Sequence, residues 1–249
     1  MTKNGDPGPC QDGAPGDVSG CPGVPYSLVI PAYNEERRIE TLLAQLEGAP
    51  GEIIFVCEGE DATPVLIRRF SDAHPDLRIR SEIRRERLGK GRAILQGLSL
   101  STAPLVGYMD ADGSTSFDEM LRLFSRLDSA DAIIGSRWKE GAVLLEPQGI
   151  ARRVQSRVFN LFIRLLFGLS FKDTQCGAKV FKKSAIDAVL KDMVSRGFEF
   201  DVELLWRLQS GGFRIREVPI SWNNMGDSRV KVSDIARMAI SLVKMRFFR

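Results

Sequence analysis

Short apolar runs alternate with amphipathic runs from Tyr26 onward, and this alternation restricts the fold more than any other feature of the sequence. The runs "YSLVIPAYN" (26–34), "EIIFVC" (52–57) and "LVGYMD" (105–110) are typical of buried strands. The segment "EERRIETLLAQLEG" between the first two has the apolar spacing of a helix that packs one face on a sheet. The pattern therefore predicts an α/β fold with a mainly parallel central sheet flanked by helices.

Local signals place further elements along the chain. Ser116 and Glu119 have the spacing of a capping box, which predicts that a helix begins there. Additional helices are expected over 63–70, 89–100 and 150–167, and additional strands over 77–81 and 131–137. We expect the segments 174–193 and 197–212 and the strand-like segment 213–222 to cover one side of the sheet rather than to form a separate domain.

Length and local composition divide the chain into three parts. A chain of 249 residues with 43% apolar composition is sufficient for one substantial core, which we place in residues 26–232. Residues 1–25 are rich in Gly, Pro and Asp and lack the apolar segment of a signal peptide, so we predict a disordered leader. Residues 233–249 have the pattern of an amphipathic, basic C-terminal helix.

Charge and the sulfur and imidazole side chains exclude several classes of protein. The net charge is only +3, from 35 basic and 32 acidic residues, which does not favour a nucleic-acid partner. The four cysteines have no CxxC spacing, so neither a zinc site nor a dense disulfide framework is expected, and a reducing compartment fits best. His74 is the single histidine and is followed by a proline, so we expect it in a surface loop rather than in a catalytic triad.

An acidic pair follows one of the predicted buried strands. Asp110 and Asp112 flank Ala111 at the end of "LVGYMD", and Gly113 allows the backbone to turn sharply. Ligands of open α/β sheets bind beyond the carboxyl ends of the strands, and paired carboxylates suit Mg²⁺ or Mn²⁺. The alternative is that the two aspartates only form a turn and cap the next helix.

An ordered set of motifs decides between these interpretations. In their order and spacing they resemble the family 2 glycosyltransferases, specifically the dolichyl-phosphate (polyprenyl-phosphate) glucosyl- and mannosyltransferases, over nearly all of 26–231. The motifs are "VIPAYNEE", "DADG", "GSR", "DTQCGAKVF" and "FEFDVELL...EVPISW". The resemblance implies a nucleotide-sugar-binding fold of the GT-A type and a metal-dependent transferase.

The resemblance also implies roles for residues on the donor side. Pro31, Tyr33 and Glu35 are expected to lie against the nucleotide, and Asp110 and Asp112 are expected to face the ribose and a metal-bound diphosphate. The usual Asp-Asp-Gly-Ser of the family is replaced here by "CEGE", so Glu58 stands where an acid contacts the nucleotide base. The departure from the family pattern at Cys57 leaves the identity of that base open. Some mannosyl members have glutamine at the position of Ser114, and this difference favours a glucosyl donor.

Three charged residues are expected near the phosphates. Lys90 lies at a predicted helix start, where backbone N–H groups and cations attract a diphosphate, although a tight turn with a solvated basic face is an alternative. Arg137 follows a predicted strand and is expected to hold a phosphate, of the donor or of the acceptor. Asp173 is the candidate that orients or deprotonates the acceptor, the alternative being a turn cap.

The acceptor side involves the C-terminal third of the chain. Ser228, Arg229 and Lys231 resemble the loop of the family near the acceptor phosphate. The helices over 150–167 and 233–249 both combine arginines with apolar residues, which fits either a membrane surface with anionic head groups or ordinary packing on the sheet. The C-terminal helix is also a candidate contact for a membrane-protein partner.

Together these features predict an inverting glycosyltransferase that depends on Mg²⁺ or Mn²⁺. It is expected to move a hexose, with glucose favoured, from UDP-glucose or GDP-mannose to dolichyl or polyprenyl phosphate, peripheral to the membrane on its cytoplasmic face. The alternatives are a GDP-mannose-dependent mannosyltransferase, a family 2 enzyme with a soluble or protein acceptor, a sugar nucleotidyltransferase, and a non-catalytic nucleotide-sugar-binding module that docks on membranes.

Overall fold

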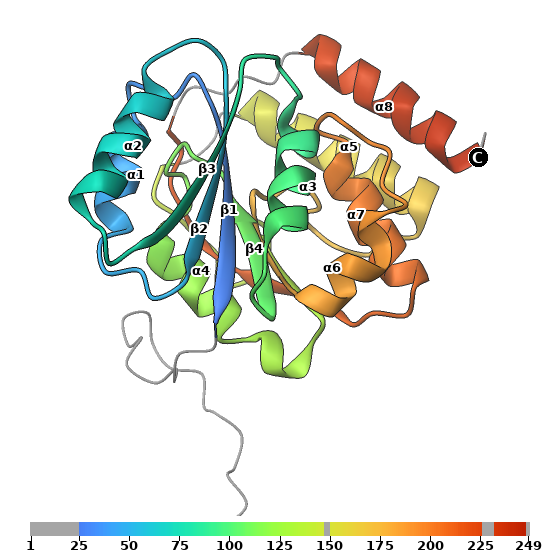
Figure 1. Ribbon diagram of the computed structural model, residues 1–249. Coiled ribbons are helices and arrows are strands. Elements are labelled where there is room, and N and C mark those ends of the chain that lie inside the picture. Colours follow the sequence, from blue (N-terminus) through green and yellow to red (C-terminus); the bar gives the residue numbers. More distant parts are fainter. Residues whose placement is uncertain (1–24, 147–149, 226–231, 248–249) are drawn as a thin grey trace, which may run out of the picture.

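The computed structural model describes residues 25–146, 150–225 and 232–247. A seven-stranded sheet lies at the centre, with strand order β3-β2-β1-β4-β7-β5-β8 (Figure 1). The strands are β1 (Tyr26–Tyr33), β2 (Glu52–Glu58), β3 (Arg78–Arg84), β4 (Leu105–Met109), β5 (Ala132–Ser136), β7 (Ala178–Lys182) and β8 (Ile215–Pro219). Two short strands, β6 (Val143–Leu144) and β9 (Ser221–Trp222), pair with each other beside this sheet.

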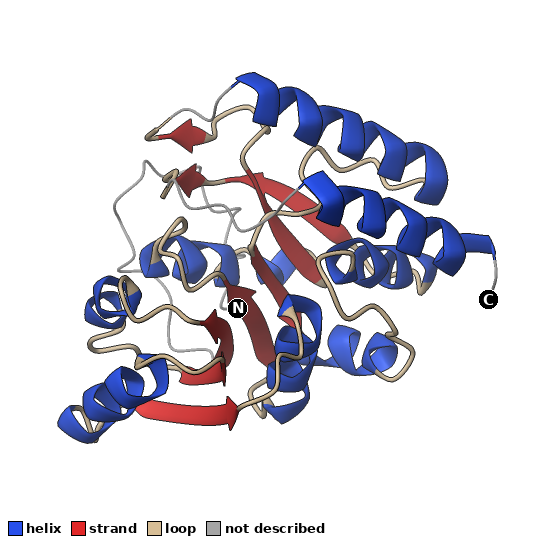
Figure 2. Ribbon diagram, turned by 90° about the horizontal axis from the view of Figure 1, so that it is seen from above, coloured by secondary structure: helices blue, strands red, loops and turns tan. Residues whose placement is uncertain are grey.

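Helices cover both faces of the sheet (Figure 2). One apolar core lies between the sheet and α1 (Ile39–Gln45), α2 (Thr63–Ala73) and α4 (Phe117–Phe124). A second core lies on the other face, under α3 (Lys90–Leu100), α6 (Lys183–Leu190) and α7 (Phe200–Ser210). A third core joins α7 to an outer pair of helices, α5 (Ile150–Phe167) and α8 (Val232–Phe247). The chain therefore has the expected α/β architecture.

The predicted elements agree closely with the observed ones. The helix predicted over 150–167 has the bounds of α5, and α3 begins one residue after the predicted start at Gly89. Ser116 caps α4 as predicted, because its hydroxyl accepts a hydrogen bond from the backbone N–H of Glu119 at 3.2 Å. The carboxylate of Glu119 does not complete the capping box but pairs with Arg122 and accepts from the N–H of Ser221.

The expectation for residues 174–193 is wrong in one respect. Their first half does not cover the sheet but forms β7, which runs antiparallel between β4 and β5 in the middle of the sheet. The apolar run of β7 is only five residues long and is interrupted by Lys179, which is fully buried. A lysine in so short an apolar run does not indicate a central strand, because lysine is rarely fully buried. It can be buried here only because a carboxylate from elsewhere in the fold pairs with it. The strand-like character of residues 213–222 is confirmed, because they form the edge strand β8 and the short strand β9.

The C-terminal helix predicted over 233–249 corresponds to α8. The predicted leader lies outside the described residues except for its last position. The C-terminal helix α8 is not an isolated element, because Met238, Leu242 and Met245 are buried against α5 and α7. None of the described helices is both long enough and apolar enough to cross a bilayer.

Candidate active site

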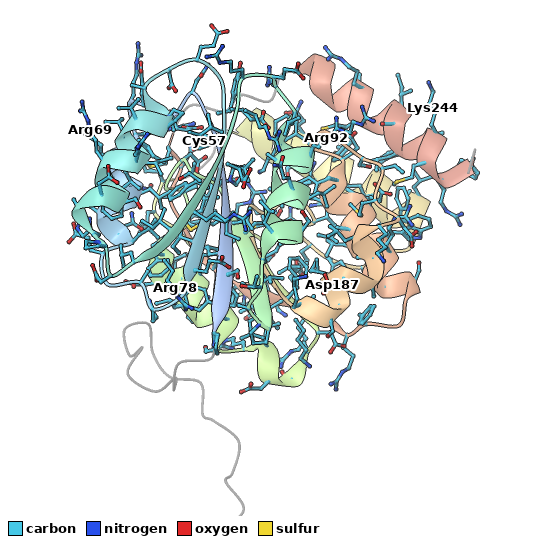
Figure 3. All side chains as sticks on the ribbon, in the orientation of Figure 1. Cys57, Arg69, Arg78, Arg92, Asp187 and Lys244 are labelled. Carbon is cyan, nitrogen blue, oxygen red and sulfur yellow. The ribbon has the colours of Figure 1, made fainter. Side chains whose placement is uncertain are left out.

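The carboxyl ends of three parallel strands bring the predicted donor residues to one edge of the sheet. Tyr33 and Glu58 end β1 and β2 and lie side by side in register, and Asp110 follows the last residue of β4. Figure 3 labels Cys57 and Arg92 toward this end of the molecule, whereas Arg78 and Asp187 lie toward the other end. A ligand at this edge is therefore within reach of several strand ends at once.

The acidic turn after β4 has the geometry that its sequence predicts. Gly113 has a φ of +74°, a left-handed conformation that glycine adopts without strain. One carboxylate oxygen of Asp112, Oδ1, accepts from the N–H of Ser114 at 2.9 Å, which fixes the turn. Neither aspartate caps α4, since Ser116 does so, and Oδ2 of Asp112 accepts no hydrogen bond from the described part of the chain.

Lys90 is the immediate partner of the first aspartate. Its Nζ lies 2.6 Å from Oδ1 of Asp110, and it is the first residue of α3 after Gly89, whose φ is +88°. Burial alone would lower the pKa of Lys90, but the nearby carboxylates of Asp110 and Asp201 outweigh burial and raise it. Lys90 therefore stays charged at the acidic edge. The side chain of Arg92, two residues further along α3, is exposed instead.

Gly177 brings the backbone of the "QCG" segment against the same aspartate. A Cβ atom at this position would lie 2.1 Å from Oδ2 of Asp110, which is closer than real Cβ contacts allow. Only glycine therefore lets the turn before β7 lie against this carboxylate. Asp110 is held between the ammonium of Lys90 and this backbone, whereas the other aspartate is held only by its own turn.

Glu58 presents one free carboxylate oxygen at the end of β2. Its Oε2 accepts from the N–H groups of Leu88 and Gly89, at 3.1 and 3.3 Å, which ties β2 to the start of α3. Its Oε1 is buried and has no hydrogen-bond partner in the described structure. Burial raises the pKa of Glu58, against the two backbone hydrogen bonds that lower it. An unpartnered buried acceptor of this kind is a place for a ligand donor.

The other residues predicted on the donor side lie around Glu58. Tyr33 lies under the guanidinium of Arg87, 4.5 Å from the ring centre, and Pro31 lies in the part of β1 that pairs with β2 and extends beyond its pairing with β4. The carboxylate of Glu35 pairs with Arg38. Cys57 points into the core, where burial raises its pKa to about 12, so the thiol is neutral.

Arg137 and Asp173, both predicted to lie near the acceptor, form a bidentate ion pair. The Nε and Nη2 atoms of Arg137 donate to Oδ2 and Oδ1 of Asp173, at 2.8 and 2.9 Å, and the backbone N–H of Arg137 adds a third hydrogen bond at 3.0 Å. The N–H of Asp173 donates to Glu217 on β8. The ring of Trp222 lies 5.5 Å from the guanidinium. The guanidinium is thereby fixed in one orientation.

This pairing bears on the role of Asp173. The carboxyl is 1% exposed; burial alone would raise its pKa, but Arg137 more than compensates and holds the pKa below its ordinary value. A carboxylate that already accepts three hydrogen bonds from one arginine is a poor proton acceptor. The geometry favours the interpretation that Asp173 orients its neighbours over the one in which it deprotonates the acceptor.

Sequence reasoning missed a buried group of three side chains next to this site. Lys179 on β7 pairs with Asp201 on α7, and the hydroxyl of Tyr108 on β4 donates to the same carboxylate. All three residues are at most 2% exposed. A lysine inside the apolar run "AKVF" is the signal that points to such a group, because a buried ammonium requires a compensating carboxylate.

The residues present fit a metal ion that takes most of its ligands from a substrate. In the part of the chain that the structure describes, no group of three or more His, Cys, Asp or Glu side chains is placed to hold a metal. Asp110 is engaged by Lys90, which leaves Asp112 with the more available oxygen. Mg²⁺ and similar hard cations are commonly held by one or two carboxylates together with waters and substrate phosphates.

The predicted acceptor loop lies outside the described residues, and α5, the other element predicted on this side, has an unexpected surface. Ser228, Arg229 and Lys231 are not among the described residues. On α5 the apolar residues fall on two sides rather than one. Phe159, Ile163 and Phe167 are buried. The opposite stripe is exposed, to 63%, 56% and 80% at Val158, Leu161 and Leu165.

The fold and the acidic strand edge define a nucleotide-dependent transferase of the GT-A type, and sequence comparison places the chain in one family. Residues 27–190 match the model of glycosyl transferase family 2, and the chain belongs to this family. It is 35% identical over 234 residues to glycosyltransferase AglD of Haloferax volcanii, covering 89% of this chain and 37% of that protein. It is 33% identical over 241 residues to dolichyl-phosphate beta-glucosyltransferase ALG5C of Trichomonas vaginalis, covering 89% and 71%.

A solved structure confirms the fold. The mannosyltransferase PcManGT from Pyrobaculum calidifontis, in complex with GDP-Man and Mn²⁺, superimposes with a TM-score of 0.58 at 19% identity. The match covers 82% of this chain and 57% of that one. This chain thus spans little more than a third of the archaeal relative and just over half of the solved structure, while it spans most of the glucosyltransferase.

Proposed function

We propose that this glycosyltransferase moves glucose from UDP-glucose to a polyprenyl phosphate such as dolichyl phosphate, with inversion, at the surface of a membrane. One observation carries the proposal: the edge of a single sheet joins a free acceptor oxygen at Glu58, an acidic turn at Asp110 and Asp112, and an arginine clamped at Arg137. These groups match, in order, a nucleobase, a diphosphate with its metal, and a second phosphate.

The free oxygen of Glu58 favours uracil as the base. Uracil offers one N–H donor, at N3, whereas guanine offers two adjacent donors that match both oxygens of a carboxylate. Oε2 of Glu58 is already occupied by the N–H groups of Leu88 and Gly89, so only Oε1 is available. The similarity to a dolichyl-phosphate beta-glucosyltransferase supports the same donor.

A divalent cation held by Asp112, either Mg²⁺ or Mn²⁺, would neutralise charge on the departing diphosphate. Lys90 is placed to contribute a second positive charge, since its ammonium is at the N-terminus of α3 beside the acidic turn. Asp110 keeps this lysine oriented and lies where the resemblance puts the ribose. The Mn²⁺ in the solved mannosyltransferase supports the metal requirement.

Arg137 is proposed to hold the acceptor phosphate for in-line attack on the anomeric carbon. Its guanidinium uses Nε and Nη2 for Asp173, which leaves Nη1 without a hydrogen bond to any described residue. A phosphate monoester is largely ionised near neutral pH and hardly needs a base, so fixing its position is the main requirement. Asp173 meets that requirement indirectly, by holding the arginine.

The exposed stripe of α5 is proposed to lie on the membrane. Val158, Leu161 and Leu165 are spaced as one face of a helix, and the exposed arginines Arg157 and Arg164 border that face. Apolar residues bordered by arginines suit an interface with anionic head groups. A lipid-linked acceptor would be presented there, on the cytoplasmic side, and the neighbouring α8 remains the candidate contact for a membrane-protein partner.

A product assay tests the proposal. The purified chain is incubated with polyprenyl phosphate, Mn²⁺ or Mg²⁺, and labelled UDP-glucose or GDP-mannose in parallel, and label in the extracted lipid is counted. We expect label from UDP-glucose only. Label from GDP-mannose alone would establish the mannosyl alternative, which the GDP-Man of the solved mannosyltransferase supports. Nucleotide-sugar binding without label in lipid from either donor would overturn the acceptor assignment.

A further inference from the structure

Lys179 is the most deeply buried cation among the described residues, and the proposed reaction does not use it. It is the second residue of β7, close to the turn that precedes this strand, and lies opposite Tyr108 on β4 and Ile134 on β5. Its side chain is 0% exposed. Its Nζ donates to the backbone carbonyl of Cys176 at 2.6 Å and pairs with Asp201. One ammonium thus joins a carboxylate of α7 to the turn that precedes its own strand.

The core does not need an ion pair at this place. Phe181 stacks with Tyr108, the ring of Phe200 packs against Tyr108 at a tilt, and the core side chains around them from β4, β5 and α7 are apolar. Replacing a buried ion pair by apolar side chains of similar volume is often neutral or stabilising, because both charges must be desolvated. Stability is therefore a weak reason for this pair, and its position near the strand ends becomes the informative property.

The turn held by Lys179 contacts both halves of the site. It begins at Asp173, which clamps Arg137, and it contains Gly177, whose backbone lies against Asp110. Between them, the Cys176 carbonyl accepts the hydrogen bond from Lys179. A shift of this turn would move the arginine of the acceptor side and the aspartate of the donor side together.

Electrostatic coupling follows the same order. Three ion pairs, Arg137–Asp173, Lys179–Asp201 and Lys90–Asp110, each join one basic and one acidic side chain. Burial and Arg137 dominate the pKa of Asp173, and Lys179 adds to its lowering. Burial and Asp110 dominate the pKa of Lys90, and Asp201 adds to its elevation. The central pair therefore lies within electrostatic reach of both outer pairs.

We propose that Lys179, balanced by Asp201, is a positioning residue that holds the 173–177 turn in register with the donor and acceptor groups. The contacts of the turn are the evidence for this role, and its effect on glucose transfer rests on the proposed function. The ammonium touches no substrate. It fixes Asp173 and Gly177 through the Cys176 carbonyl, so that Arg137 and Asp110 face the same space.

The test uses the full chain and the double variant K179M/D201N. Met fills the space of the lysine, and the amide oxygen of Asn still accepts from Tyr108, so no charge is left unpaired. We expect faster hydrogen exchange in the peptide over 173–178, UDP binding with Mn²⁺ weakened at least fivefold, and glucose transfer reduced at least tenfold in kcat. Tyr108→Phe, which removes one hydroxyl, should shift all three in the same direction to a smaller extent.

Arg207→Met is the matched control. Arg207 pairs with Glu203, a fully buried carboxylate on the same helix α7, but this pair contacts residues 194 and 195 rather than the turn. The control should lower the melting temperature without changing UDP affinity or exchange at 173–178. Unchanged exchange in K179M/D201N, or equal effects of the control on UDP binding, would overturn the role of Lys179. If K179M/D201N changes exchange and UDP binding but the wild-type chain never labels lipid, the role of Lys179 stands and the acceptor assignment is wrong.

Discussion

The carboxylate of Asp173 accepts three hydrogen bonds from Arg137, two from the guanidinium and one from the backbone N–H. The asymmetry of this pair decides its function. The aspartate side chain is 1% exposed, while the arginine side chain is 17% exposed. The buried aspartate orients the arginine, and under the proposed function the partly exposed guanidinium is the group that would meet the acceptor phosphate.

Asp173→Asn should impair both stability and transfer. Breaking a buried ion pair costs about 3–5 kcal/mol, and misplacing Arg137 by about 1 Å reduces transfer by roughly 10²-fold. The pKa of Asp173 is lowered in the folded chain, so its contribution to stability is present above the ordinary aspartate value of about 3.9 and is lost as pH falls through the lowered pKa. Urea unfolding between pH 3 and 7 and the lipid-labelling assay measure the two effects.

Asp131→Asn is the control for this prediction. Asp131 also pairs with a basic side chain, that of Lys182 at 3.0 Å, but both side chains are partly exposed and lie away from the site. It should leave transfer unchanged. If D173N transfers glucose at the wild-type rate, the assignment of Arg137 to the acceptor phosphate is wrong.

Glu58→Gln should raise stability while weakening donor binding. Burial raises the pKa of Glu58, so its contribution to stability is largest below the ordinary glutamate value of about 4.3 and diminishes as pH rises through the raised pKa. Gln does not titrate, so the variant gains stability relative to wild type between pH 4 and 8. An amide N–H₂ at the place of Oε1 repels the uracil N–H, and losing a charged hydrogen bond of roughly 1.5–3 kcal/mol weakens UDP binding at least tenfold.

Urea unfolding at several pH values and calorimetric titration with UDP and Mn²⁺ measure these effects. Glu60→Gln, at an exposed position two residues further on, should change neither quantity. Wild-type UDP affinity in E58Q would remove Glu58 from the base site and reopen the choice between uracil and guanine.

The sequence was most informative where local chemistry decides the structure. The strand before Asp110, the left-handed turn at Gly113 and the start of α3 at Lys90 follow from local patterns, and the structure confirms all three. The pairing of Lys90 with Asp110 does not follow, because it depends on how α3 lies against β4. Lys179 was missed for the same reason, since its partner comes from a helix 22 residues later whose position is set by tertiary packing.

Asp112→Ala should abolish metal-dependent binding without unfolding the chain. The side chain is partly exposed and makes one local hydrogen bond, to the N–H of Ser114, so its loss costs little stability. Counting free Mn²⁺ by electron paramagnetic resonance in the presence of UDP should show at least tenfold weaker metal retention, and transfer should disappear. Asp118→Ala, an exposed aspartate on α4, serves as the control. Normal metal retention in D112A would refute its assignment as a ligand.

Gly177→Ala should damage the donor side specifically. The new Cβ would lie 2.1 Å from Oδ2 of Asp110, so either the carboxylate or the turn must move. Gly97→Ala is a matched control, since its Cβ would lie 2.3 Å from Cγ1 of Val29 in the core and far from the acidic turn. Both variants should lose stability by about 1–3 kcal/mol from overpacking, but only G177A should lose UDP and Mn²⁺ affinity in calorimetry. Equal affinity in the two variants would show that the contact with Asp110 has no consequence.

The double variant L161D/L165D should detach the chain from anionic membranes while leaving the chemistry intact. Burying a leucine in an apolar environment contributes about 1.5–3 kcal/mol, so replacing two exposed leucines on α5 reduces vesicle binding by at least tenfold. Sedimentation with phosphatidylcholine vesicles that contain phosphatidylglycerol measures binding, which should also weaken with added salt in the wild type. Val65→Asp, at a 51% exposed valine of α2, should bind vesicles normally. Transfer to a short, water-soluble polyprenyl phosphate should be the same in all three chains, and only transfer to acceptor embedded in vesicles should fall. A variant that sediments like the wild type would show that this face of α5 meets something other than lipid.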